Sequence, residues 1–485
     1  MGLGDEEAKQ FLVTIKKEEV VAPLRSTPLA QEHWLPMSNL DLLFSSKTDV
    51  ASILCYKKPK SSQPNFNGHS LIVSLKKSLA QVLVPFFPLA GELVHNSLGE
   101  PEIWCNNRGV DFIEAYADVE LEKLNLYNLD ESFVIGKLVP EKKRGILAVQ
   151  ATELKCGSMV VVCLFDHRCL DGYSGSMFIT SWAEFTRSKP LIYNRPSLRR
   201  SILNPHRLGC IDTTVQDMYV HKETPETPSL SILNNDHPIL SSRLYYIKAE
   251  HIKNLQIQAS SNNNNNITKF ESFSAFLWKM IAKSSSASNV KKLCRMGFFV
   301  DGRKLLAGGE GEDNMMKFYI GNVLSTPFWG KKICDLNKEP LNQVAREVHE
   351  CLETILTKEH FLGILDWVEA LRPKPGMFRI SSFERDDGLN FIMSSGLRLL
   401  YGEGDFGWGK PILWSAHFPS GFQEIAKGGY VMPMLNPNGN GDWVVYMHLH
   451  MSQLEFIEKE ASNILVPLTF DHLEKIHYTN INSKI

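Results

Sequence analysis

The sequence has no cysteine spacing that indicates a disulfide framework or a zinc site. Its nine cysteines stand singly, their number is odd, and no two of them form a C-x-x-C pair. Reduced thiols of this kind are typical of a cytosolic enzyme. No apolar run reaches the ~18 residues of a transmembrane helix, and the polar, acidic first residues lack the apolar stretch of a signal peptide. These absences predict a cytoplasmic protein.

The chain also has no excess of charge of either sign. Its 52 Lys and Arg residues nearly cancel its 54 Asp and Glu residues, which leaves a net charge of −2. Such a balance creates no long-range field toward nucleic acid or an anionic membrane, and we expect neither as a partner. We expect a monomer that acts on small molecules. The ending Ser483-Lys484-Ile485 differs by one residue from the peroxisomal signal S-K-L, so the peroxisome is a weaker alternative to the cytoplasm.

What is present is enough apolar material for sizeable cores, because hydrophobic residues make up 43% of the 485-residue chain, and its length predicts two or three domains. Hydrophobic periodicity predicts strands over 70–75, 159–165, 296–301, 391–399 and 443–449, and helices over 75–86, 172–188 and 270–282. Scattered prolines and lost periodicity follow the helix at 172–188. We therefore predict an α/β protein with a first domain over 1–190, a crossover linker over 191–240 and a second domain over 241–485.

The first feature that can carry chemistry is the turn after the predicted strand at 159–165. It reads Phe165-Asp166-His167-Arg168-Cys169-Leu170-Asp171-Gly172, so a His follows a buried strand and a helix begins shortly afterwards. α/β proteins place reactive groups at such strand ends, and a His there suits a general base near neutral pH. The H-x-x-x-D spacing alone is weak. His167 is equally compatible with a structural role, Asp171 is well placed as a helix N-cap, and a metal site lacks a third ligand nearby.

The second feature is the glycine-rich segment from Gly402 to Pro411, which contains Asp405-Phe406-Gly407-Trp408-Gly409. Its glycines match G-x-G-x-x-G, but a dinucleotide site also requires a helix to begin there. Because Pro411 and another strand-like run follow, we reject that interpretation and predict a tight turn that needs glycine.

Covalent nucleophiles have little support in the sequence. The segment Gly172-Tyr173-Ser174-Gly175 is one residue short of the G-x-S-x-G nucleophile elbow. Cys169 lies two residues from His167, a spacing that does not bring the two side chains face to face on a helix. We interpret Cys169 as a packed thiol.

Taken together, the H-x-x-x-D and D-F-G-W-G segments resemble those of the plant BAHD acyltransferases. Further matches in the same order are Trp34 to Asp41, Leu75 to Gly91, Phe273 to Trp278, Val300 to Arg303 and Gly321 to Val323. The likeness covers nearly the whole chain. Within the family it is greatest to coniferyl alcohol acyltransferase-type members.

The resemblance implies two domains of similar α/β fold, like chloramphenicol acetyltransferase, which meet along a channel that acyl-CoA and acceptor enter from opposite ends. It assigns His167 and Asp405 to catalysis, with His167 as general base and Asp405 as a residue that shapes the coenzyme A channel without doing the proton chemistry. It assigns a structural role to Asp171, paired with Arg303, and to Gly407 and Trp408.

The resemblance also points to an oxyanion donor. In shikimate-type transferases a Thr and a Trp upstream of D-F-G-W-G assist the oxyanion, and the matching positions here are Ser394 and Gly396. Ser394 keeps a hydroxyl and is the oxyanion candidate, whereas Gly396 cannot replace the Trp. No metal, permanently bound cofactor or acyl-enzyme is implied, and acyl-CoA is a cosubstrate.

We therefore expect an acyltransferase that moves an acyl group from acyl-CoA to a small-molecule alcohol through a ternary complex. Coniferyl alcohol and acetyl-CoA are the first guess for its substrates. The alternatives are a hydroxycinnamoyl- or benzoyl-CoA donor, another alcohol, an alkaloid or an amine as acceptor, and a non-catalytic relative that binds a ligand. A hydrolase is disfavoured by the missing nucleophile elbow.

Overall fold

A computed structural model describes residues 11–25, 34–44, 48–58, 68–188, 196–207, 213–221, 240–260, 266–307, 313–374, 376–383, 388–419 and 428–474 of the protein. The tripeptide 483–485 and much of the predicted crossover lie outside these residues.

The first sheet has the strand order β1-β6-β7-β8-β3-β17. Its strands are β1 (Val13–Val21), β6 (Val110–Ala117), β7 (Leu147–Leu154), β8 (Met159–Asp166), β3 (Asp49–Tyr56) and β17 (Leu413–His417). Every residue of β8 is buried, and β8 pairs antiparallel with both β7 and β3. Its sequence has no charged side chain before Asp166, so both of its faces can be covered.

The second sheet has the strand order β14-β11-β16-β18-β19-β10-β20. Its strands are β14 (Phe328–Lys332), β11 (Leu293–Phe298), β16 (Gly388–Met393), β18 (Tyr430–Leu435), β19 (Trp443–His450), β10 (Leu240–Ile247) and β20 (Val466–Pro467). Three small sheets pair β2 (Trp34–Pro36) with β5 (Pro101–Trp104) and β4 (Glu92–His95), β12 (Val300–Asp301) with β13 (Leu324–Ser325), and β15 (Gly376–Phe378) with β9 (Tyr219–His221).

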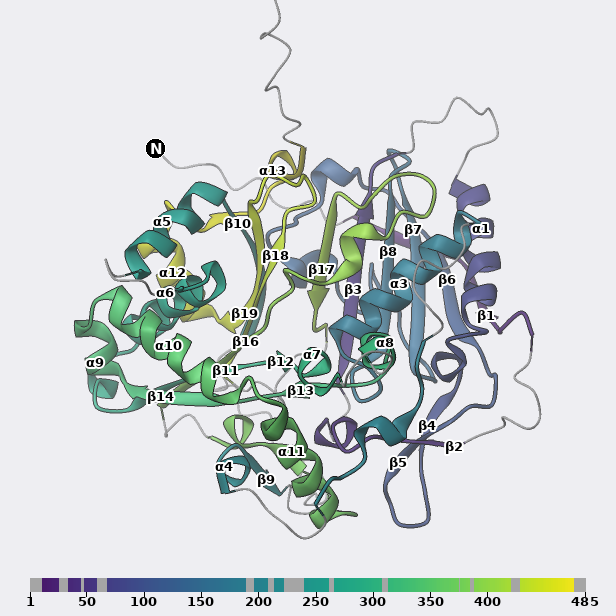
Figure 1. Ribbon diagram of the computed structural model, residues 1–485. Helices are drawn as coiled ribbons and strands as arrows, with labels where there is room; N and C mark the ends of the chain where they lie inside the picture. The colour runs from purple at the N-terminus through teal and green to yellow at the C-terminus, as the bar shows by residue number, and fades with distance from the viewer. Residues whose placement is uncertain are drawn as a thin grey trace, which may run out of the picture.

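Helices lie on the two large sheets and beside the smaller ones (Figure 1). They are α1 (Gly68–Val82), α2 (Leu129–Ser132), α3 (Gly172–Thr186), α4 (Thr213–Gln216), α5 (Ala249–Ala259), α6 (Lys269–Lys283), α7 (Arg303–Leu306), α8 (Asp313–Lys317), α9 (Ile333–Lys338), α10 (Leu341–Ile355), α11 (Lys358–Leu371), α12 (Met451–Glu460) and α13 (Phe470–Glu474). Helices α1 and α3 lie together on the first sheet, where the Trp182 indole N–H donates to Leu75 O (3.1 Å). Helices α5, α6, α10 and α12 gather on the side of the second sheet that faces away from the first.

Most predicted elements are confirmed, and two are wrong. The strands at 159–165 and 443–449 correspond to β8 and β19, and the helices at 172–188 and 270–282 correspond to α3 and α6. The predicted strand at 70–75 is instead helix α1, whose buried residues Leu71, Leu75, Leu79 and Val82 follow helical spacing. The strand predicted over 391–399 ends at Met393, because a Ser-Ser-Gly sequence that favours turns follows it.

A strand from the second half of the chain completes the first sheet. Strand β17 pairs antiparallel with β3, so that Trp414 lies opposite Leu54. Residues 413–417 of the predicted second domain therefore belong to the first sheet. One continuous hydrophobic core also contains residues of both halves, such as Phe178, Phe378 and Tyr446. Within the described ranges no helix has the length and apolar character needed to span a bilayer.

Candidate active site around His167

The turn that carries His167 is fixed on both sides. The His167 backbone N–H donates to Thr48 O (2.9 Å). The preceding carboxylate, Asp166, accepts hydrogen bonds from the Arg168 guanidinium (Nε 2.9 Å, Nη2 2.6 Å) and from the Arg168 backbone N–H (3.1 Å). Lys142 Nζ lies 3.8 Å from the same carboxylate. A buried charged cluster thus holds the end of β8 in place.

The His167 side chain is buried but keeps 8% of its surface exposed. Its ring stacks on Phe44, with centroids 4.7 Å apart and planes 11° apart. Burial lowers the pKa of His167 below its ordinary value, although its own backbone and the carboxylates of Asp171 and Asp166 favour the charged form. Because the neutral imidazole accepts protons, the lowered pKa keeps His167 available as a base at neutral pH and somewhat below.

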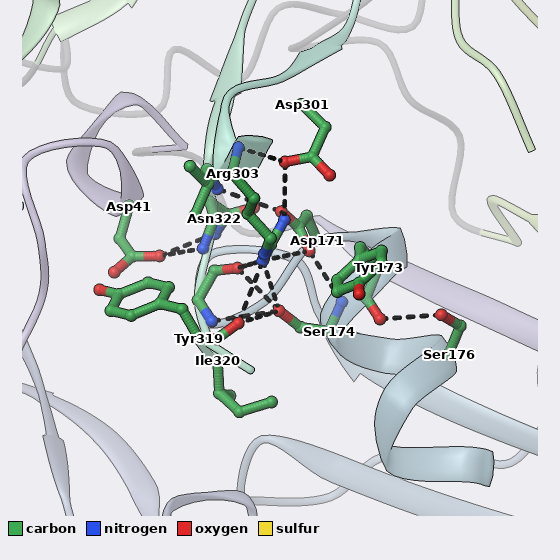
Figure 2. A network of polar contacts seen from close by, with 12 residues as sticks. Asp41, Asp171, Tyr173, Ser174, Ser176, Asp301, Arg303, Tyr319, Ile320 and Asn322 are labelled. Carbon is green, nitrogen blue, oxygen red and sulfur yellow. Dashed lines mark hydrogen bonds and ion pairs between the residues drawn. The ribbon is translucent and has the colours of Figure 1, made fainter. Parts of the chain in front are cut away.

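Asp171 is the N-cap of α3 and the partner of Arg303 (Figure 2). Its Oδ1 accepts from Ser174 N–H (2.9 Å) and from Arg303 Nη2 (3.1 Å). Its Oδ2 accepts from Arg303 Nη1 (2.8 Å) and Val323 N–H (3.1 Å). Four donors fill the acceptor positions of a carboxylate. The structure thus brings Asp171 and Arg303 together and commits the Asp171 oxygens to structural bonds.

The charges of this pair stabilise each other. Burial alone would raise the pKa of Asp171, but the charge of Arg303 and the hydrogen bonds to the carboxylate outweigh it and lower that pKa. The pKa of Arg303 is raised by the charges of Asp171 and Asp301 against the effect of its own burial. Asp171 therefore stays ionised and paired, which makes it unsuited to accept the substrate proton.

The two candidate nucleophiles near His167 are occupied or inert. Ser174 Oγ donates to Gly321 O (2.9 Å) and accepts from Arg303 Nη2 (2.9 Å). Burial raises the pKa of the Cys169 thiol well above its ordinary value, so this thiol stays protonated. Neither group has the surroundings of an activated nucleophile.

The Asp405 segment is a tight turn organised by its own carboxylate. Asp405 Oδ1 accepts from the backbone N–H groups of Gly407 (2.8 Å) and Gly409 (2.9 Å). Both glycines have positive φ values, 102° and 108°, which side chains disfavour. Trp408 packs edge-on against Tyr56, with ring centroids 5.6 Å apart.

The structure does not bring Asp405 to His167. The Tyr56 hydroxyl donates to Gly404 O (2.6 Å), and Tyr56 pairs with Met159 at the start of β8, whereas His167 follows its end. At ~3.3 Å per residue, β8 separates the two places by roughly 23 Å. Arg187, 3.5 Å from Asp405, likewise follows the far end of α3. This separation supports a role for Asp405 in holding the turn rather than in the proton chemistry at His167.

Ser394 follows β16, and its backbone N–H donates to Val431 O (2.9 Å). Its side chain hydrogen-bonds to the Tyr430 hydroxyl. Tyr430 lies against Phe299 (centroids 6.2 Å apart), which in turn lies against Phe44 (6.2 Å). An aromatic row thus leads from Ser394 toward His167. At Gly396 a Cβ would meet Met434 Cγ at 2.8 Å and the Trp414 indole at 3.1 Å, so neighbouring side chains take the space of a side chain there.

Sequence analysis missed three residues that contact the His167 turn directly or through one neighbour. They are Phe44, Asp41 and Asn322. The resemblance covered the segments of Asp41 and Asn322 without giving either residue a role, and it did not extend to Phe44. The available signal was a charged residue inside the apolar run Leu40-Asp41-Leu42-Leu43-Phe44, since a buried carboxylate requires partners.

Metal ligands do not gather anywhere in the described part of the chain: no three His, Cys, Asp or Glu side chains there are arranged to hold an ion. The described cysteines are free thiols.

Comparison with known proteins shows which family and which relatives this chain is similar to. A family model described as "Transferase family" matches residues 11–464. The chain is 29% identical to omega-hydroxypalmitate O-feruloyl transferase of Arabidopsis thaliana over 391 residues, 78% of this chain and 79% of the relative. It is 25% identical to shikimate O-hydroxycinnamoyltransferase of Nicotiana tabacum over 461 residues, 92% and 98% of the two chains.

A solved structure shows the same fold at low identity. TRI101 of F. graminearum, complexed with coenzyme A and deoxynivalenol, superposes with a TM-score of 0.70 at 13% identity, over 89% of this chain and 99% of that chain. The predicted α/β fold class is thereby confirmed.

Proposed function

Because the chain belongs to the Transferase family, the BAHD acyl-CoA-dependent acyltransferases, we propose that it transfers an acyl group from a coenzyme A thioester to a small-molecule hydroxyl with His167 as general base. The observation that carries this proposal is that the His167 imidazole is buried and has a lowered pKa, while the nearby Asp171 carboxylate is fully hydrogen-bonded to other groups. A base that remains neutral and a carboxylate that cannot compete for the proton suit deprotonation of an alcohol.

The proposed reaction needs only groups of this chain and its two substrates. His167 takes the proton of the acceptor hydroxyl as the oxygen attacks the thioester carbonyl. The tetrahedral oxyanion is stabilised by hydrogen-bond donors, for which Ser394 is our candidate. Collapse breaks the carbon–sulfur bond, and the proton held by His167 neutralises the leaving thiolate. The imidazole is thereby restored to its neutral form.

No acyl-enzyme takes part in this proposal. The thioester is already an activated donor, and the hydroxyl of Ser174 and the thiol of Cys169 are held in structural or inert states. What the reaction requires is the orientation of two substrates at one carbonyl, which can lower the barrier by up to roughly 7–11 kcal/mol in ideal cases.

For substrates we propose an acyl-CoA donor and an alcohol acceptor, with acetyl-CoA and coniferyl alcohol as the first pair to test. Support for an alcohol comes from the names of the two relatives, whose acceptors are a hydroxy fatty acid and shikimate. Their feruloyl and hydroxycinnamoyl donors make aromatic acyl-CoA the alternative donor class.

The experiment that tests the proposal is a matrix of donors against acceptors with the products identified by mass spectrometry. The donors are acetyl-, benzoyl-, p-coumaroyl- and feruloyl-CoA, and the acceptors include coniferyl alcohol, shikimate, a long-chain alcohol and an aromatic amine. We expect at least one ester that the matched His167→Ala protein does not form. Absence of any acyl transfer from every donor would contradict the proposal and favour a ligand-binding relative.

A further inference from the structure

Asn322 connects the His167 turn to Asp41, near the start of the chain, and Figure 2 shows its contact with Asp41. Its side-chain Nδ2 donates to His167 O (3.0 Å) and Arg168 O (3.1 Å). The same Nδ2 and the Asn322 backbone N–H both donate to Asp41 Oδ1, at 3.1 and 2.6 Å. Asn322 is completely buried, so no water replaces these bonds if they are lost.

Asp41 contributes, together with the carbonyls of the His167 turn, to the orientation of the Asn322 amide. Its Oδ2 accepts from the Ser38 N–H (3.0 Å) and hydroxyl (2.7 Å), which holds the carboxylate in one orientation. An ionised carboxylate can only accept hydrogen bonds. Asp41 therefore requires the NH₂ group of Asn322 on its side, and that NH₂ group is also the donor to the carbonyls of the His167 turn.

Close packing leaves this arrangement little room to relax. Gly321, with φ of 148°, precedes Asn322, and a Cβ on it would lie 2.9 Å from Arg200 Nη1 and 3.3 Å from Asp41 Oδ1. Arg200 Nη1 in turn donates to the Tyr319 hydroxyl (2.7 Å). The segment around Asn322 and the segment around Asp41 are thus held in a fixed position relative to each other.

The same early segment reaches the imidazole itself through Phe44. The Phe44 ring stacks on the His167 ring at 4.7 Å, and its own position is set by Phe378, edge-on at 5.1 Å, and by Phe299 at 6.2 Å. The ring torsion of a His side chain is intrinsically broad, because it joins an sp³ to an sp² centre. A stacked aromatic face narrows that torsion to the plane of its neighbour.

We propose that residues 38–44 are a positioning element for His167, in which Asp41 holds the backbone of the His167 turn through Asn322 and Phe44 fixes the plane of the imidazole. The proposal rests on the proposed role of His167 as general base. It assigns no substrate contact to these residues.

The first test replaces Phe44 by Leu, which keeps an apolar side chain and removes the ring. We expect kcat to fall at least ~10-fold with little change in KM for either substrate, since a misplacement of about 1 Å can cost ~10²-fold in rate. The matched control is Phe178→Leu, a ring equally buried and packed edge-on against Phe86 and Phe165. It should lower Tm comparably and leave kcat within about twofold of wild type. A Phe44→Leu protein with unchanged kcat, or with raised KM alone, would overturn the proposal.

A second measurement does not depend on activity. In protein labelled with ¹³C-histidine, the His167 signal is identified by its absence in His167→Ala. The ring current of a stacked phenyl group shifts the His167 ring proton upfield, so Phe44→Leu should move this signal downfield, and Phe178→Leu should not. An unmoved signal in Phe44→Leu would refute the stacking role even if no acyl transfer is ever found. If the His167 signal moves in Phe44→Leu but the wild type shows no acyl transfer, the stacking contact is supported and only the proposed function is refuted.

The third test is a double-mutant cycle between Asp41→Asn and Asn322→Ala. If Asp41 acts through the Asn322 amide, the double variant should have the kcat of Asn322→Ala alone. If the losses in kcat of the two single variants multiply in the double variant, Asp41 and Asn322 act independently, which would contradict the proposed route. If either variant fails to fold, the Phe44 measurements decide.

Discussion

The Arg303 guanidinium donates to both oxygens of the Asp171 carboxylate, from Nη1 to Oδ2 at 2.8 Å and from Nη2 to Oδ1 at 3.1 Å. Both side chains are almost fully removed from solvent. Asp171 caps the N-terminus of α3 in the first half of the chain, and Arg303 is the first residue of α7 in the second. The pair therefore joins the two halves four residues after His167. It also directs the carboxylate of the H-x-x-x-D motif toward the scaffold.

The Asp171→Ala variant should lose stability and activity together. Removing one partner leaves the Arg303 charge buried and unpaired, which typically costs about 3–5 kcal/mol in the free energy of unfolding. Urea unfolding and initial rates measured on the same preparations check this. The control is Asp301→Asn, because Asp301 lies 3.1 Å from the same guanidinium but has 41% of its side chain exposed. It should cost below ~1 kcal/mol. Wild-type stability of Asp171→Ala with lost activity would point to direct catalysis by Asp171.

The Asp405→Ala variant should damage the turn and leave the proton chemistry alone. It loses two backbone hydrogen bonds to a carboxylate, and we expect about 2 kcal/mol of destabilisation, with activity reduced through folding or coenzyme A affinity. Asp405→Asn keeps an acceptor oxygen and should retain most of the stability. The pH dependence of kcat should be unchanged in both proteins. A structure with Asp405 bonded to the acceptor hydroxyl would disprove this account.

Initial-rate plots that vary donor and acceptor should intersect, as a ternary complex requires, and Cys169→Ala should remain active. The reason is that the Cys169 thiol is buried and protonated, and that the Ser174 hydroxyl is engaged with Gly321 and Arg303. Parallel lines would indicate a covalent intermediate. So would a mass increase that maps to either residue after incubation with donor alone.

Stability should fall as the pH drops from about 6.5 toward 4, because of two buried histidines outside the site. Burial lowers the pKa of His417 and of His448 to about 4 each. The unfolded chain binds protons at the ordinary pKa of ~6.5, so it is favoured in this window by up to about 3 kcal/mol per ring. Urea unfolding at pH 7, 6 and 5 measures the slope. His417→Leu should flatten it, and the exposed His69→Gln should not; equal slopes in all three proteins would rule this cause out.

Sequence patterns predicted the parts of the fold that local chemistry determines. The uninterrupted apolar run at 159–165 became β8, and Asp171 caps α3 as its position before Gly172 suggested. The H-x-x-x-D and D-F-G-W-G segments identified the family, and Pro411 correctly argued against a nucleotide-binding helix, since β17 follows.

Contacts between residues that are far apart in the sequence could not be predicted from these patterns. Nothing in the local sequence of 413–417 says that this strand joins the first sheet beside β3. The separation of Asp405 from His167 also depends on which end of β3 meets Gly404. The stacking of Phe44 on His167 joins residues 123 positions apart, and without the fold a single phenylalanine in an apolar run is indistinguishable from ordinary core.

The central claim is that His167 is the general base, and its most direct test is the acyl-transfer rate of His167→Ala on a substrate pair that the wild type converts. We expect a folded protein, verified by circular dichroism and Tm, with kcat reduced at least ~10²-fold. In the wild type, the acid limb of the pH–rate profile should lie below the ordinary histidine pKa, because burial lowers the pKa of His167 and only its neutral form accepts the proton. A His167→Ala protein that retains activity within a few-fold of the wild type would contradict the account.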